Sequence, residues 1–110
     1  MAANDFRIEL IGKSQLKDPI VKLASRLVDI FSTDSGITWV GRVVTLDVSD
    51  NLQIYMSCKA ITGTGWTFTV KNVGTDKNIY EVDGVTGEPL ESRNGERIPN
   101  FSERETSKPI

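Results

Sequence analysis

Apolar and polar residues alternate with a period of two in several stretches of this chain. Phe6, Ile8 and Leu10 are separated by charged residues and followed by Gly12, which is the pattern of a strand with one buried face. The alternation recurs over residues 52–59 and 66–71, and a shorter stretch covers residues 79–82. The positions that share the inward side of the two longer stretches are Leu52, Ile54, Met56 and Cys58, then Trp66, Phe68 and Val70.

Between residues 16 and 31 the apolar spacing changes to that of a helix. Asp18 in the N-cap position and Pro19 as the first helical residue mark a start, and the polar stretch 32–36 marks an end. We therefore predict an α-helix with one apolar side. The apolar residues at helical spacing are Leu16, Ile20, Leu23, Ala24, Leu27, Ile30 and Phe31.

Residues 37–48 are too long a stretch for an ordinary strand, because full extension would give about 40 Å. The apolar residues also change parity, from Ile37 and Trp39 to Val44 and Leu46. A bulge or bend at Gly41 would return them to one buried face, and we predict one there.

The order of these elements predicts an α+β fold. One N-terminal helix would pack on a curved, mostly antiparallel sheet of about five strands, in the order strand, helix and then four strands. Cystatin-like folds have this order, but the analogy is one of topology and implies no family. Residues 1–90 form the predicted domain. Residues 91–110 are mostly polar and predict a C-terminal tail, anchored to the domain by Ile98 and Phe101.

The amino-acid composition argues against several classes of function. The 110 residues carry a net charge of −2 with both signs interspersed, which argues against a nucleic-acid partner. The sequence has no histidine, so Ser-His-Asp and Cys-His triads and most zinc sites are excluded. Cys58 falls on the inward parity, where a thiol behaves as a small hydrophobic group. We therefore expect no enzymatic activity, no cofactor and no metal.

The apolar stretches of the chain bear on its cellular location. No apolar run approaches the roughly 20 residues that span a bilayer, and the first residues lack the apolar core of a secretion signal. We expect a cytoplasmic protein with no membrane partner.

Residues 63–65, "GTG", lack the third glycine of a phosphate-binding loop and precede a strand instead of a helix, so we expect a hairpin connection there.

Two candidate sites follow from the strand patterns. The first is the outer sheet face, whose residues carry little charge and suit a protein partner, although strand propensity alone also explains the threonines. Its members are Val43, Thr45, Tyr55, Thr67 and Thr69. The second is a pocket between helix and sheet. Trp39 and Trp66 would line it and Glu81 or Asp83 would supply polarity, although both tryptophans also suit a filled core.

The leading hypothesis is a non-enzymatic protein-interaction module: an inhibitor, an immunity-type factor, an adaptor or an assembly subunit. It would act through the outer sheet face, the hairpin tips and the tail, on another protein or on a second copy of itself. The alternative is a small-molecule-binding domain or small enzyme that uses the pocket between helix and sheet.

Overall fold

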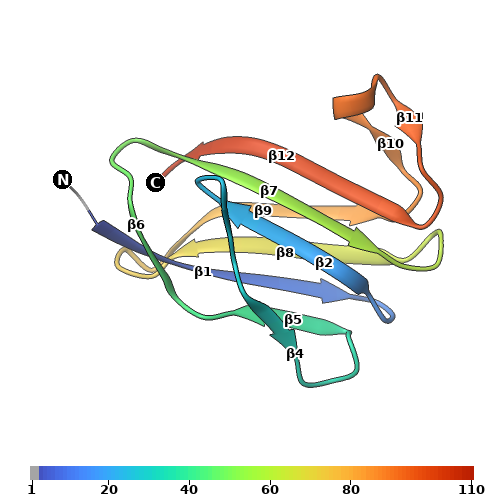
Figure 1. Ribbon diagram of the computed structural model, residues 1–110, viewed down its shortest axis with the longest axis horizontal. Helices are drawn as coiled ribbons and strands as arrows, with labels where there is room; N and C mark the ends of the chain where they lie inside the picture. Colours follow the sequence, from blue (N-terminus) through green and yellow to red (C-terminus); the bar gives the residue numbers. More distant parts are fainter. Residues whose placement is uncertain (1–2) are drawn as a thin grey trace.

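A computed structural model describes residues 3–110, and this part of the chain is built almost entirely from strands (Figure 1). Its one helical element is a short 3₁₀ turn, η1 (Glu91–Arg93), and no helix among these residues is long and apolar enough to cross a membrane. The strands are β1 (Ala3–Gly12), β2 (Lys17–Leu23), β3 (Arg26–Leu27), β4 (Ile30–Ser32), β5 (Thr38–Gly41), β6 (Val44–Asp47), β7 (Asn51–Lys59), β8 (Gly65–Asn72), β9 (Lys77–Val85), β10 (Pro89–Leu90), β11 (Glu96–Arg97) and β12 (Phe101–Pro109).

Two antiparallel sheets pack face to face. Sheet A has the order β4-β5-β1-β8-β9, with β6 paired to the first residues of β1. Sheet B has the order β12-β7-β2-β3, and β10 with β11 forms a separate hairpin that projects from one corner (Figure 1). The protein is therefore a β-sandwich.

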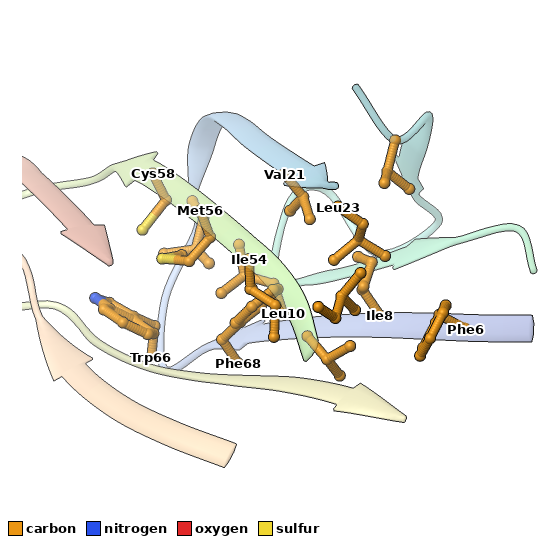
Figure 2. Close-up of a cluster of buried hydrophobic side chains, with 14 of the residues drawn as sticks. Phe6, Ile8, Leu10, Val21, Leu23, Ile54, Met56, Cys58, Trp66 and Phe68 are labelled. Carbon is orange, nitrogen blue, oxygen red and sulfur yellow. The ribbon is translucent and has the colours of Figure 1, made fainter. Parts of the chain in front are cut away.

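One hydrophobic core lies between the sheets. Figure 2 shows Trp66 and Phe68 of β8 beside Met56 and Ile54 of β7. Every inward position predicted for residues 6–10, 52–58 and 66–70 is at most 2 % exposed. The period-two patterns are thus confirmed as strands with one buried face, because each sheet supplies the apolar surface that covers the other.

The prediction of a helix is wrong. The predicted α+β class and the cystatin-like order of elements depend on that helix, so they are wrong as well. Residues 17–32 form β2, β3 and β4. In β2, Val21 and Leu23 are buried while Ile20 and Lys22 are exposed, which is the period of a strand. The residues predicted to start the helix, Asp18 and Pro19, lie at an irregularity in β2.

A tight turn between β2 and β3 excludes the helix directly. Leu23 pairs with Arg26, so Ala24 and Ser25 form a two-residue loop. Their φ angles are 51° and 65°, the left-handed conformation of a hairpin turn. Two consecutive left-handed residues cannot belong to a right-handed helix. The usual residues of such a two-residue turn are asparagine, aspartate and glycine, so Ala24 and Ser25 do not predict it.

The predicted interruption at Gly41 is confirmed. β5 ends there, β6 begins at Val44, and the two strands pair with different parts of β1. A Cβ added at Gly41 would lie 3.1 Å from side-chain atoms of both Ile8 and Val28, so the backbone passes close to the core. The bend places Trp39 and Leu46, which have opposite parity, against the same core.

The polar C-terminal segment contains a full edge strand. β12 pairs with β7 from Phe101 to Pro109, and Ile110 donates its backbone N–H to the Asp50 carbonyl at 3.1 Å. Ile98 and Phe101 are both half-buried. Main-chain hydrogen bonds along β7 therefore hold this segment to sheet B.

Candidate functional site

The five residues predicted to bind a partner do not share one surface. Thr67 and Thr69 lie on the outer face of sheet A, and Thr45 on β6 donates its hydroxyl to Asp5 at 2.5 Å. Val43 is in the β5–β6 connection and is 41 % exposed. Tyr55 lies on β7, in sheet B, so it faces the opposite side of the sandwich.

The four residues of the predicted pocket are separated by sheet A itself. Trp66 is 2 % exposed within the core, and Trp39 is half-buried, with its Nε1 donating to the Gly36 carbonyl at 2.9 Å. Glu81 and Asp83 are exposed on β9, on the outer face of the sheet. A pocket between helix and sheet has no counterpart, because residues 17–32 form strands.

The outer face of sheet A carries an exposed patch with an apolar side. Strand pairing aligns Phe31 with Val40 on one row and Ile11 with Thr38 on the next. Phe31 is 47 % exposed and Ile11 is 39 % exposed. The two rows continue onto β8 through Thr69 and Thr67. We call these residues the apolar patch: Ile11, Phe31, Thr38, Val40, Thr67 and Thr69.

A network of side chains fixes the hairpin that presents Phe31. Asp34 Oδ1 accepts hydrogen bonds from the Thr38 backbone at 2.7 Å and from the Ser32 hydroxyl at 2.9 Å. The Gly36 backbone N–H donates to Ser32 Oγ at 2.9 Å. The hydrogen bond from the Thr38 backbone is the main cause that lowers the pKa of Asp34. The polar stretch 32–36 therefore closes a β4–β5 hairpin, where we had predicted the end of a helix.

Carboxylates lie within the apolar patch and beside it. Glu9 lies between Val40 and Thr69 on its row, and Glu81 and Asp83 stand beyond the threonines on β9. Thr67 donates its hydroxyl to Asp83 at 2.8 Å. Among the described residues, no lysine or arginine lies on these two rows. Along these two rows the face is apolar over β4 and β5 and acidic toward β9, whereas Arg7 and Lys71 lie on the neighbouring row.

Tyr55 already has partners within its own chain. Its hydroxyl donates to Glu103 Oε2 at 2.6 Å, and Lys22 Nζ lies 5.8 Å from the ring centroid. Burial, followed by the hydrogen bond to Glu103, raises the pKa of Tyr55, so the phenol is neutral. A groove of about 490 Å³ runs beside it, past Gln53 and Glu105. Because its ring and hydroxyl are both engaged, Tyr55 is a weak candidate for partner binding.

The long edge strands β9 and β12 lie on the same side of the sandwich and are not paired with each other as strands (Figure 1). At one end the edges are joined: Ser102 Oγ donates to the Val85 carbonyl at 3.1 Å, and Gly87 N donates to the Phe101 carbonyl at 2.9 Å. Farther along, a cleft of about 560 Å³ opens beside Tyr80.

Both of these edges carry charges that oppose further strand pairing. Glu81 and Asp83 project outward from β9, and Glu103 and Glu105 from β12. Lys108 lies on the inward face of β12, with its Nζ 5.4 Å from the Tyr80 ring centroid. Charged side chains on an edge, including inward-facing ones, prevent strands of other molecules from pairing with it. These edges are therefore poor candidates for partner binding.

The ionisable side chains in the core and at its margin are either paired or protonated. Arg104 forms an ion pair with Glu88, and its guanidinium lies 5.2 Å from the Trp66 ring centroid. Burial, and then the nearby charge of Glu88, raises the pKa of the Cys58 thiol to about 12, so the thiol is protonated at neutral pH. Over residues 3–110, no three His, Cys, Asp or Glu side chains come together in a group that could hold a metal ion.

Four members of the apolar patch were not among the predicted site residues: Ile11, Phe31, Thr38 and Val40. Phe31 was assigned to the buried side of a helix, and no local signal corrects that assignment. Ile11 had a readable signal, because it continues the polar parity of Arg7 and Glu9 and so had to face outward. An apolar residue on the polar side of a strand marks a surface position of interest.

Comparisons of this chain with family models, with curated proteins and with solved structures gave no match.

Proposed function

We propose that this protein is a non-enzymatic interaction module that binds a partner protein on the outer face of sheet A. The exposure of Phe31 on the edge strand β4 and of Ile11 on the inner strand β1, on one face of sheet A, carries the proposal. Large aromatic and aliphatic side chains that are left exposed on a rigid surface are typical anchors of protein interfaces. Inhibitors, immunity-type factors, adaptors and assembly subunits all work by this kind of contact.

The charge and the area of the outer face of sheet A indicate what kind of partner would fit it. The acidic side of the face, formed by Glu9, Glu81 and Asp83, favours a partner that places lysine or arginine beside its own apolar residues. The molecule measures 42 × 34 × 20 Å, so its broad face exceeds the roughly 800 Å² that each side of a standard interface buries.

Phe31→Glu is expected to weaken partner binding by at least about 30-fold, because truncating or charging an aromatic anchor costs about 2 kcal/mol or more. The matched control is Leu27→Glu on β3 in sheet B, where Leu27 is 67 % exposed. The partner would first be captured from the native source with the wild-type chain, then purified and titrated by calorimetry against all three proteins.

Hydrogen exchange of the complex locates the contact. Protection is expected in β1, β4, β5 and β8. Equal loss of affinity in the Phe31 and Leu27 variants, or protection confined to sheet B, would contradict binding through sheet A.

A further inference from the structure

A small hollow lies at the end of sheet B, and no residue of the apolar patch lines it. β2 begins there at Lys17, β7 ends at Lys59 and β12 begins at Phe101, and these three residues are paired on one row. The connections that leave the strands surround a space of about 270 Å³. We call it the lysine hollow, and the residues used below are Ser14, Gln15, Lys17, Lys59, Ile61 and Asn100.

Two lysines stand directly opposite each other in this hollow. Lys17 pairs with Lys59 across neighbouring strands, and like charges in that position destabilise a sheet. Among the described residues the ion pairs are Lys71–Asp76 and Arg104–Glu88, so neither lysine of the hollow has an acidic partner. The folded chain therefore concentrates two positive charges at one point without neutralising them.

An irregularity in β2 creates this pairing. Ile20 pairs with Ser57 and Lys17 with Lys59, so Asp18 and Pro19 together oppose the single residue Cys58. A regular strand would have placed Asp18 opposite Lys59, which is a favourable pair of opposite charges. Instead, Asp18 takes a φ of 47°, a conformation that is rare outside glycine. Bulges of this kind redirect side chains and are common beside binding sites.

The amide of Asn100 is held with its donor group unused. Asn100 Oδ1 accepts hydrogen bonds from the backbone N–H and the hydroxyl of Thr62, both at 2.9 Å, and Asn100 N donates to the Thr62 hydroxyl at 3.0 Å. These bonds fix which end of the amide faces Thr62. Asn100 Nδ2 has no partner among the described residues, and Asn100 lines the hollow.

We infer that the lysine hollow binds an oxyanion, such as the phosphate group of a phosphate ester. Two ammonium groups, the Asn100 amide, the Ser14 hydroxyl and the Gln15 amide can all donate hydrogen bonds to anionic oxygens. The bound charge would also relieve the repulsion between Lys17 and Lys59. The space is slightly smaller than the roughly 300 Å³ at which pockets for whole drug-sized ligands begin, so it suits a head group. Ile61, which is 80 % exposed at the rim, offers contact to an apolar body beyond it.

The test is a titration of the full chain followed by amide NMR shifts at constant ionic strength. Inorganic phosphate and phenyl phosphate are the probes, and sodium chloride is the reference salt. Saturable shifts are expected at Ser14, Gln15, Lys59, Ile61 and Asn100. Tighter binding of phenyl phosphate would indicate an ester with an apolar body, and equal binding a free oxyanion.

Single variants distinguish specific binding in the hollow from nonspecific attraction of phosphate by surface charge. Lys17→Gln and Lys59→Gln are expected to weaken phosphate binding at least tenfold. Lys77→Gln is the matched control, because it removes one exposed charge at the start of β9, outside the hollow. Asn100→Asp keeps an acceptor for Thr62 but replaces the free donor with a negative oxygen, so it should abolish binding.

The same variants distinguish a binding role from a structural one. Without phosphate, Lys59→Gln should raise the melting temperature, because it removes the repulsion, and Lys77→Gln should leave it unchanged. Shifts that do not saturate, or an equal loss of binding in Lys77→Gln and Lys59→Gln, would overturn the inference. Phe31→Glu should leave phosphate binding intact, so this result is independent of the proposed protein interface.

Discussion

Trp66→Ala is expected to lower the free energy of unfolding by about 3–5 kcal/mol. Trp66 is the largest fully buried side chain and lies between the two sheets (Figure 2). The guanidinium of Arg104 lies over its ring. Its Nε1 makes no hydrogen bond within residues 3–110. The loss therefore comes from apolar contacts and from the cavity that remains. Urea unfolding followed by far-ultraviolet circular dichroism measures it.

Trp39→Ala is the matched control for this experiment. The Trp39 ring packs at the margin of the same core and is only half-buried, so its removal leaves a smaller cavity that water can reach. We expect a clearly smaller loss of stability for Trp39→Ala. Equal losses for the two variants would mean that Trp66 is not the centre of the core.

Gly84→Ala is expected to destabilise the protein by about 1–3 kcal/mol, the usual effect of overpacking. Alanine normally favours ordered backbone over glycine, so the expected sign is unusual. Its cause is space: a Cβ at Gly84 would lie 2.2 Å from Cζ2 of Trp66. Gly84 in the edge strand β9 therefore provides the flat surface on which the indole rests.

Two further variants test whether the contact between Gly84 and Trp66 causes this loss of stability. At Gly74 an added Cβ would meet only the Asn72 side-chain oxygen, at 3.6 Å, so Gly74→Ala should be close to neutral. Combining Gly84→Ala with Trp66→Phe removes the indole ring atoms that clash. The double variant should lose less stability than the sum of the single variants, a coupling that urea unfolding can measure. Additive losses would refute direct contact as the cause.

The sequence predicted the strands at residues 6–12, 52–59 and 66–71 because their apolar residues alternate with polar ones, but it predicted a polar tail where β12 forms. It failed at residues 17–32, where apolar residues satisfy both a helical and a strand period. Val21 and Leu23 are covered by a second sheet that residues far away in the chain provide. Local spacing carries no information about that partner, and the turn at Ala24 and Ser25 gives no recognisable signal.

The candidate sites show a second limit of strand patterns. Alternation tells which side of a strand faces the core, but it does not tell to which sheet the strand belongs. Tyr55 and Thr67 both face outward, as predicted, yet they lie on opposite faces of the sandwich. Glu81 and Asp83 alternate with Tyr80 and Val82, so their outward orientation was readable from the sequence.

The position of β1 in sheet A has a consequence for the kinetics of folding. β1 is an inner strand, and its partners β5 and β8 come much later in the chain, the latter beginning only at Gly65. The search for such distant partners makes folding slow, in the range of milliseconds to seconds for β-sandwiches. During synthesis, one edge of β1 can pair with β5 and β6, but the edge that pairs with β8 stays unpaired until residues 65–72 have been made. Newly made chains are therefore most exposed to aggregation, or to chaperones, through their first strand.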